Sequence, residues 1–152
     1  MPGMAQTFDV CIRGSGIVGR TLALLLARDR LRVALVGPGD TPSSAEPHED
    51  VRAYALNAIS RGLLQSLRAW PDARHATPVA RMEIQGDQDG CVHFDATAQG
   101  VDALAWIVDV PALEARLAEA VRYQPQVELV SSAVPATLTA VCEGRASRTR
   151  DE

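Results

Sequence analysis

The sequence lacks an excess of positive charge, a long hydrophobic run and paired cysteines. Its 152 residues include 15 basic and 19 acidic side chains, whereas proteins that bind nucleic acids present a basic face. The longest apolar runs, such as residues 22–27, fall far short of the roughly 20 residues that cross a bilayer. No basic residue precedes an apolar stretch at the start, so we expect no signal peptide. Cys11, Cys91 and Cys142 form no CxxC motif, which indicates reduced thiols and a cytoplasmic protein.

Histidine is also sparse, which argues against a metal site. His48, His75 and His93 are isolated, without an HxxxH or HExxH motif and without a cysteine at ligand spacing. We therefore expect solvated or hydrogen-bonded histidines and no bound metal. A composition of 47% hydrophobic and 22% charged residues excludes wholesale disorder, and the length leaves room for one domain.

The first forty residues predict a strand, a helix and a second strand. Residues 8–12 are a short apolar run, residues 17–29 are rich in Leu and Ala, and residues 32–36 are rich in Val. This succession is a βαβ unit, in which two parallel strands are joined by a right-handed crossover. Residues 37–50 contain three prolines and no Ile, Leu, Val, Met or Phe, so we expect a surface loop there.

The rest of the chain predicts two amphipathic helices and several short strands. The first helix, with Asn57 as its cap and Pro71 just past its end, is expected to bury one face. That face consists of Leu56, Ile59, Leu63, Leu67 and Trp70. The second helix, with a proline in its first turn, is expected to bury Val110, Leu113, Leu117 and Val121. Strands are expected at 79–85, 91–95, 104–108, 127–130 and 136–142, with a hairpin connection at 86–90.

A glycine motif joins the first strand to the first helix. The motif G-x-G-x-x-G is formed by Gly14, Ser15, Gly16, Ile17, Val18 and Gly19. Between a strand and a helix, this pattern is typical of dinucleotide binding. We expect Gly14 to allow a sharp turn, Gly16 to let a pyrophosphate approach the backbone, and Gly19 to let the helix pack closely. The unpaired amides of the helix N-terminus would attract the phosphates.

Two observations keep a purely structural glycine turn open as the alternative. Eleven glycines in a chain of this length sometimes form the pattern without a ligand. The acid that should end the second strand and bind the ribose is missing, because Gly37 stands in its place. Asp40 lies three residues further on, in the proline-rich loop, where a turn residue is the simpler interpretation.

Several further segments together resemble one enzyme family. They are Asp50–Leu56, which reads D-x-R-x-x-A-L, then Ser60-Arg61 and Trp70, and the stretches 82–84, 94–96 and 104–109. With the glycine motif, they resemble the flavin-dependent hydroxylases of ubiquinone biosynthesis, relatives of para-hydroxybenzoate hydroxylase. The similarity runs from Phe8 to about Thr139.

The resemblance implies a fold, a cofactor and a substrate class. The implied fold class is α/β, a Rossmann-like FAD-binding domain with a parallel sheet and part of a β-rich substrate region. Residues 1–142 would form this partial FAD-binding domain, and residues 143–152 a mobile polar tail. Arg52 would contact FAD, and Val134 would lie near the adenine. The alternative role of Arg52 is to neutralise Glu49 and Asp50 at the surface. NAD(P)H would be the co-substrate and a polyprenylated phenol the substrate. The resemblance also leaves open a homo-oligomer and an association with a ubiquinone-biosynthesis complex or the periphery of the inner membrane.

The chain also departs from this family. Members are at least about twice as long, and the Gly-Asp motif that holds their flavin is not found here. We therefore expect this chain alone to be inactive. Two other functions stay open: a non-catalytic nucleotide-binding or assembly module, and an NAD(P)-binding Rossmann domain. Bound flavin and turnover of NAD(P)H would distinguish the three.

Overall fold

The computed structural model of the chain describes residues 7–37, 50–87, 89–144, 147 and 149. The chain divides into two compact units, Met1–His48 with Leu117–Glu152, and Glu49–Arg116. The predicted loop between residues 37 and 50, with Asp40, His48 and Glu49, lies outside the described residues apart from its two ends. None of the helices in the described part of the chain has the length and apolar character needed to cross a bilayer.

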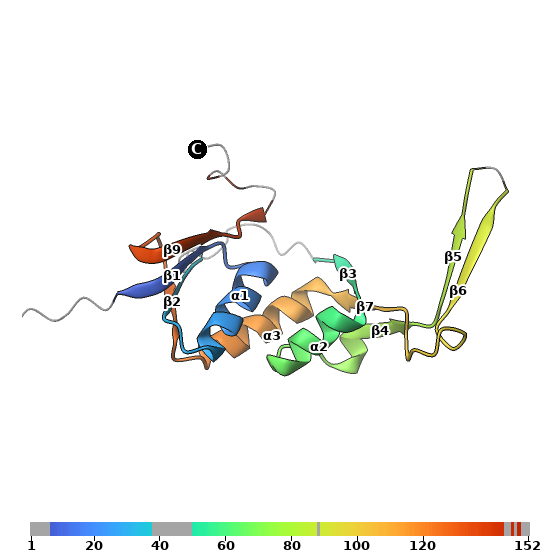
Figure 1. Ribbon diagram of the computed structural model, residues 1–152, viewed down its shortest axis with the longest axis horizontal. Helices are drawn as coiled ribbons and strands as arrows, with labels where there is room; N and C mark the ends of the chain where they lie inside the picture. Colours follow the sequence, from blue (N-terminus) through green and yellow to red (C-terminus); the bar gives the residue numbers. More distant parts are fainter. Residues whose placement is uncertain (1–6, 38–49, 88, 145–146, 148, 150–152) are drawn as a thin grey trace, which may run out of the picture. The chain divides into compact units, whose positions relative to one another are not determined.

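The first unit is built on a four-stranded parallel sheet (Figure 1). Its strands are β1 (Phe8–Arg13), β2 (Val33–Val36), β8 (Val127–Val130) and β9 (Ala136–Val141). Their order is β8-β2-β1-β9, and every neighbouring pair is parallel. The predicted α/β class and the strand–helix–strand unit are therefore confirmed.

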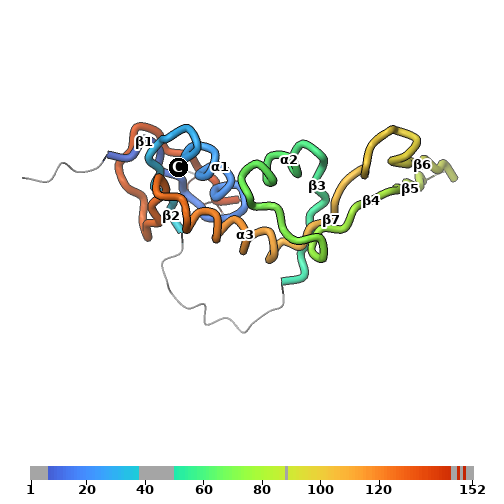
Figure 2. Tube along the Cα trace, turned by 90° about the horizontal axis from the view of Figure 1, so that it is seen from below, coloured from blue at the N-terminus to red at the C-terminus, as the bar shows by residue number. Residues whose placement is uncertain are grey.

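Helix α1 (Ile17–Arg28) packs against this sheet and contacts β1, β2 and β8 (Figure 2). Its Ala23, Leu24 and Ala27 are buried, as are the central residues of the first two strands. Those strand residues are Val10, Cys11, Ile12, Val33, Ala34 and Leu35. The helix ends where Arg30 takes a positive φ of 64° and the chain turns back toward β2.

Strand β9 forms an edge of the sheet and carries exposed apolar side chains. Leu138 is 61% exposed and Val141 is 49% exposed. Among the described residues, β9 has one strand partner, β1, and stands last in the strand order. An edge of this kind offers unpaired backbone groups next to apolar surface.

The second unit contains a three-stranded antiparallel sheet with β7 in the middle. The strands are β3 (Ala53–Leu56), β7 (Ala105–Asp109) and β4 (Ala76–Val79), and the short 3-10 helix η1 (Ala73–His75) precedes β4. Residues 53–56 of the D-x-R-x-x-A-L segment pair with β7, and the chain then reaches the Asn57 cap of the next helix. The predicted strand 79–85 is two strands, of which β4 contains Pro78 and lies at the sheet edge, where proline is tolerated.

Helix α2 (Ala58–Ser66) starts as predicted, but it is shorter and buries a different face. Asn57 caps it, with the side-chain oxygen accepting a hydrogen bond from the Ser60 amide at 2.9 Å. Ile59, expected in the core, is 82% exposed, whereas Leu64 is buried. The helix stops before Trp70 because Arg68 adopts a positive φ of 56°.

Two further elements of the chain match the sequence pattern closely. Helix α3 (Val110–Arg122) buries the four predicted residues, Val110, Leu113, Leu117 and Val121. Strands β5 (Arg81–Gln85) and β6 (Cys91–Asp95) form the predicted antiparallel hairpin.

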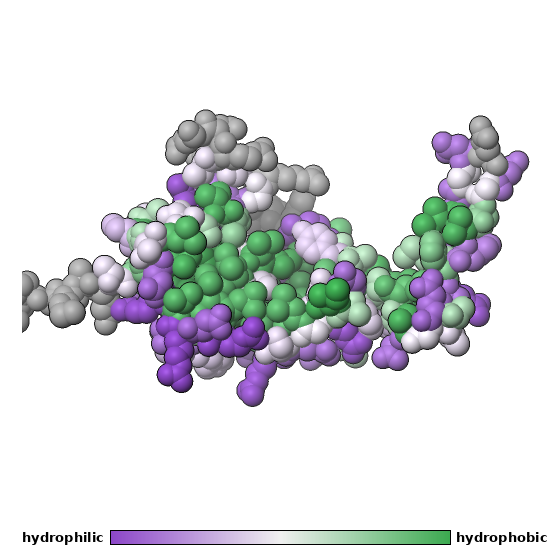
Figure 3. Space-filling view, in the orientation of Figure 1, coloured by the Kyte–Doolittle hydropathy of each residue, from purple (hydrophilic) through white to green (hydrophobic). Residues whose placement is uncertain are grey.

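The hairpin has one apolar and one polar face, because side chains alternate along a strand. Met82 is opposite Phe94, and Ile84 is opposite Val92. All four of these apolar residues are at least partly exposed, and hydrophobic residues are visible midway along the hairpin in Figure 3. The polar face carries Arg81, Glu83, Gln85, Cys91, His93 and Asp95.

Candidate functional site

The glycine motif lies at the carboxyl edge of the parallel sheet, where the strand order reverses. From β1 the chain proceeds through α1 to β2 on one side, and β9 later pairs with β1 on the other side. Ligands of open α/β sheets bind at such a switch point, outside the carboxyl ends of the strands. The turn is fixed to its neighbours, since the Gly14 amide donates to Val36 O at 3.2 Å and the Cys142 amide donates to Arg13 O at 2.7 Å.

The structure accounts for each of the three glycines of the motif in a different way. Gly14 has a φ of +110°, and a side chain there would meet the backbone carbonyl of Cys142. A side chain at Gly19 would overlap the Gly14 carbonyl oxygen, so α1 approaches the turn as predicted. Gly16 differs, because a Cβ atom there would have nothing within 4 Å. Its φ of −77° suits any residue.

Open space at Gly16 coincides with an uncapped helix end. Gly16 is the N-cap of α1 and makes no side-chain capping bond, and the first turn holds no acidic residue. The side chain of Val18, in that turn, is 66% exposed, and Ile17 is half-buried. The free amides and positive end of this helix are suited to an anion that approaches the turn.

Ser15 and Gly37 face each other at the end of β2. A Cβ atom on Gly37 would lie 3.0 Å from Ser15 Oγ and 3.3 Å from Ser15 Cβ. A side chain at position 37, where the fingerprint places a ribose-binding acid, would therefore press on Ser15 unless the serine moved. The glycine that replaces the acid in the sequence thus lies directly against the Ser15 side chain in the structure.

An ion pair that the sequence did not predict lies beside the glycine turn. Arg13 Nε is 3.2 Å from Glu143 Oε1, and both side chains are half-buried. The Glu143 carboxylate also accepts hydrogen bonds from the hydroxyls of Ser147 at 2.8 Å and Thr149 at 2.9 Å. These hydroxyls, with Arg13 adding to them, lower the pKa of Glu143. The pairing was hidden because it depends on β9 lying next to β1.

Val134 and Arg52 are the two remaining predicted cofactor residues. Val134 is half-buried in the loop between β8 and β9, in the same unit as the glycine turn. Arg52 belongs to the second unit. There its guanidinium forms a two-pronged ion pair with Asp50, with Nε–Oδ1 at 2.9 Å and Nη2–Oδ2 at 2.7 Å. This pair is the surface neutralisation that the sequence left open as an alternative role.

Arg52 borders a hollow of about 560 Å³ in the second unit. The hollow is lined by Asp50, Val51, Arg52, His75, Asp109, Pro111 and Ala112. His75 Nδ1 lies 2.8 Å from Asp109 Oδ2, which confirms a hydrogen-bonded histidine. The Arg52 hydrogen bonds lower the pKa of Asp50 to about 2, and Asp50 in turn raises the pKa of Arg52. The hollow therefore holds a permanent cation that a phosphate oxygen could share.

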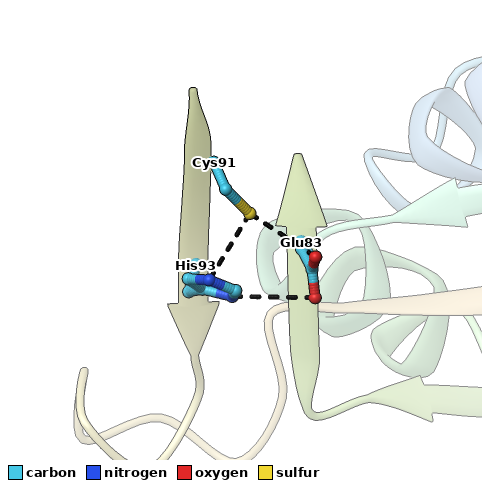
Figure 4. A group of neighbouring side chains, drawn as sticks. All are labelled: Glu83, Cys91 and His93. Atoms are coloured by element: carbon cyan, nitrogen blue, oxygen red, sulfur yellow. Dashed lines mark hydrogen bonds and ion pairs between the residues drawn. The ribbon is translucent and has the colours of Figure 1, made fainter. Parts of the chain in front are cut away.

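His93 is not isolated, contrary to the expectation from the sequence. On the polar face of the hairpin, Cys91 Sγ lies 3.4 Å from His93 Nε2 and donates to Glu83 Oε1 at 3.5 Å (Figure 4). His93 Nδ1 is 3.8 Å from Glu83 Oε2. We call Glu83, Cys91 and His93 the hairpin cluster. In the sequence, only the Cys-x-His spacing on one strand indicates this cluster. Glu83 lies next to the other two residues because the strand register places it opposite His93.

The fold of this chain is shared with several oxygenases of known structure. The chain aligns with p-nitrophenol 4-monooxygenase from Pseudomonas putida over 95% of its length and 42% of that chain, with a TM-score of 0.65 and 20% identity. For 2-methyl-3-hydroxypyridine-5-carboxylic acid oxygenase the TM-score is 0.67 at 18% identity, over 96% of this chain and 42% of the other. A probable FAD-dependent monooxygenase from Pseudomonas aeruginosa gives 0.55 at 24% identity, over 82% of this chain and 33% of that one. These likenesses establish the fold.

The sequence is similar to one particular enzyme. It is 32% identical over 139 residues to the 3-demethoxyubiquinol 3-hydroxylase of Escherichia coli strain K12. The aligned region covers 90% of this chain and 35% of that protein. The resemblance to ubiquinone-biosynthesis hydroxylases is therefore confirmed, and the chain spans about a third of the length of this relative. No family model matches the chain.

Proposed function

We propose that the chain is the FAD-binding portion of an aromatic-ring hydroxylase and holds the ADP half of FAD at the turn between β1 and α1. The observation that carries the proposal is Gly16, whose missing side chain leaves open space at an uncapped helix end. The space lies at the sheet edge where α/β proteins bind nucleotides. Similarity to a hydroxylase rather than to a dehydrogenase favours FAD over NAD(P) as the bound dinucleotide.

The residues of the turn have complementary tasks in this proposal. Amides at the start of α1 donate to the pyrophosphate, while Gly14 and Gly19 keep the helix close enough to β1 to aim them. The Val134 backbone would contact the adenine. Because Gly37 stands in the place of the ribose acid, we expect the ribose to be bound without a carboxylate from the end of β2.

Arg52 is the proposed cationic contact to the cofactor. A guanidinium makes strong paired bonds to phosphate oxygens, and the pair with Asp50 occupies only part of its donors. Binding through Arg52 would therefore take place beside Asp50 or displace it. When bound, FAD reduced by NAD(P)H would supply the chemistry that adds oxygen to an aromatic ring. We propose a polyprenylated phenol of ubiquinone biosynthesis as the substrate, and the inner-membrane periphery as the place where such a substrate is met.

A binding experiment tests the cofactor assignment. Purified chain is titrated with FAD, ADP and NAD, and the affinity is measured by calorimetry and by flavin absorbance between roughly 350 and 500 nm. Gly16→Val should abolish binding of FAD and ADP, because its methyl groups fill the pyrophosphate space. Gly62→Val is the matched control, since Gly62 also has nothing within 4 Å of its Cβ position but lies on α2. Unchanged affinity in Gly16→Val would refute the site, and tighter binding of NAD than of FAD would favour a dehydrogenase-type domain.

Catalysis is tested separately from binding. With FAD, NAD(P)H, oxygen and phenols supplied, we expect this chain alone to give no product coupled to NAD(P)H consumption. Exclusion of water protects reactive intermediates, and the residues that would cover the flavin ring are not identified in this chain. Tightly coupled hydroxylation would show a complete enzyme, whereas FAD binding without NAD(P)H turnover would fit a binding or assembly module.

A further inference from the structure

The hairpin cluster brings three different metal-binding atoms to one place on the protein surface. The thiol of Cys91, the imidazole of His93 and the carboxylate of Glu83 offer ligand atoms that all lie within 4.8 Å of one another. The three side chains point toward one another from two antiparallel strands (Figure 4). Among the described residues, this is the one group of three such side chains close enough to hold a metal ion.

Two of the three distances between the ligand atoms match those around a tetrahedral zinc ion. Zinc lies roughly 2.3 Å from thiolate sulfur and 2.0–2.2 Å from imidazole nitrogen or carboxylate oxygen, so two ligand atoms on one ion are roughly 3.4–3.6 Å apart. Cys91 Sγ lies 3.4 Å from His93 Nε2 and 3.5 Å from Glu83 Oε1. We propose that Glu83, Cys91 and His93 bind a zinc ion across the β5–β6 hairpin, with the fourth ligand position open to water.

The chemical nature of the ligands selects zinc over other common cations. Magnesium and calcium prefer oxygen ligands only, whereas thiolate and imidazole together suit zinc. Three protein ligands with one open position are usual for zinc sites that exchange a water molecule. All three side chains are exposed, so an ion can enter from solvent without opening the fold.

A bound ion would tie the two strands of the hairpin together. A two-stranded ribbon is marginally stable alone, and within the described part of the chain β5 and β6 form a sheet of two strands. Glu83 stands on β5 opposite His93 on β6, so a metal joins the strands in their observed register. Binding to the folded hairpin in this way stabilises it by an amount that rises with the logarithm of the zinc concentration once that concentration exceeds the Kd.

A catalytic cysteine is the competing interpretation of the same three side chains. A nucleophilic cysteine needs a lowered thiol pKa and a surrounding that favours the thiolate. Here partial desolvation, together with the hydrogen bond to Glu83, raises the pKa of Cys91. The thiol is thus paired with a carboxylate that repels its anion, and a cation between them removes that repulsion.

Zinc titration of the full-length, tag-free, reduced chain tests the site. Zinc affinity is measured by competition with a chromogenic chelator, and cobalt substitution reports a thiolate ligand through its charge-transfer band. We expect one zinc ion per chain, and a loss of at least about tenfold in affinity in each of Cys91→Ser, His93→Gln and Glu83→Gln. Cys142→Ser and His75→Gln are the matched controls, because they remove the same ligand types away from the hairpin.

Alkylation mapped by mass spectrometry gives a second readout that does not depend on the variants. Zinc should protect Cys91 from iodoacetamide and leave the modification of Cys142 unchanged. Loss of affinity in Cys91→Ser alone, with normal binding in His93→Gln and Glu83→Gln, would indicate a single-thiol adduct and overturn the proposal. Equal losses in the controls, or an unprotected Cys91, would overturn it as well.

Discussion

The guanidinium of Arg61 lies over the ring of Trp106, with its central carbon 4.4 Å from the ring centroid. Trp70 stands perpendicular to Trp106, with 6.4 Å between the ring centroids, and its own centroid is 5.8 Å from the same guanidinium. Arg61 Nε is buried without a hydrogen-bond partner in the described part of the chain. The ring faces are therefore its principal compensation for leaving water.

Removing this cation should destabilise the second unit. We expect Arg61→Ala to lower the free energy of unfolding by about 1–2 kcal/mol, the range of a desolvated cation–π contact, with a smaller loss in Arg61→Lys. Urea unfolding followed by tryptophan fluorescence is direct, because the two tryptophans of the chain both belong to this cluster. Arg74→Ala controls for loss of a surface charge. Equal stability of Arg61→Ala and the parent protein would show that the rings contribute nothing.

The glycines at the turn should differ in their tolerance of alanine. Gly19→Ala should lower stability markedly, because the new methyl group overlaps the Gly14 carbonyl oxygen. Gly16→Ala should leave the melting temperature nearly unchanged, since its Cβ position is open and its φ is ordinary. Thermal unfolding by circular dichroism compares the two. A large destabilisation by Gly16→Ala would mean that the space is not open.

Asp50 should titrate far below an ordinary carboxyl group. The folded-state pKa of Asp50 is lowered from 3.8 to about 2, chiefly by the hydrogen bonds from Arg52. The contribution of this pair to folding stability is therefore fully present above pH 3.8. It is lost as the pH falls from 3.8 through about 2. Carboxyl titration by NMR should show the Asp50 pKa return toward 3.8 in Arg52→Ala.

Arg81→Ala serves as the control for that titration. Arg81 pairs with Asp95 at 2.9 Å, so its removal should raise the pKa of Asp95 and leave that of Asp50 unchanged. An ordinary Asp50 pKa in the parent protein would contradict the ion pair. If a phosphate of the cofactor displaces Asp50 from Arg52, ADP should also raise the pKa of Asp50.

The exposed edge strand should promote self-association. Leu138 and Val141 add apolar surface to the unpaired side of β9, so we expect concentration-dependent oligomers in analytical ultracentrifugation. Leu138→Lys should shift the protein toward monomer, because a charge at an edge opposes strand pairing. Leu129→Lys, which alters an exposed residue of the opposite edge strand, tests whether β9 is the specific contact. A parent chain that is monomeric at all concentrations would refute the expectation.

Regular patterns in the sequence predicted the elements whose packing is local. The buried face of α3 follows from a spacing of three and four residues with Pro111 in the first turn. Ser15, Gly16 and their neighbours were placed correctly between strand and helix because the motif and its flanks reinforce each other. These features depend on contacts between residues close in sequence.

What the sequence did not reveal depends on distant pairing or on the chemistry of single side chains. The strand 53–56 is short, and its partner β7 lies some fifty residues later. The buried face of α2 was predicted wrongly because hydropathy places Arg61 at the surface. In the structure, the Arg61 guanidinium packs against the rings of Trp70 and Trp106. Likewise, the pairs Arg13–Glu143 and Glu83–His93 exist only once strand register is known.

The register of β1 also has a consequence for the order of folding. Its two strand partners are β2, which follows at once, and β9, which is synthesised only after the whole second unit. On a ribosome, the nucleotide turn would therefore emerge early but receive its second wall, the Cys142 backbone, only after the second unit has been synthesised. Until then one side of β1 stays available to any extended segment, so the antiparallel strands of the second unit are made in the presence of an unpaired parallel edge.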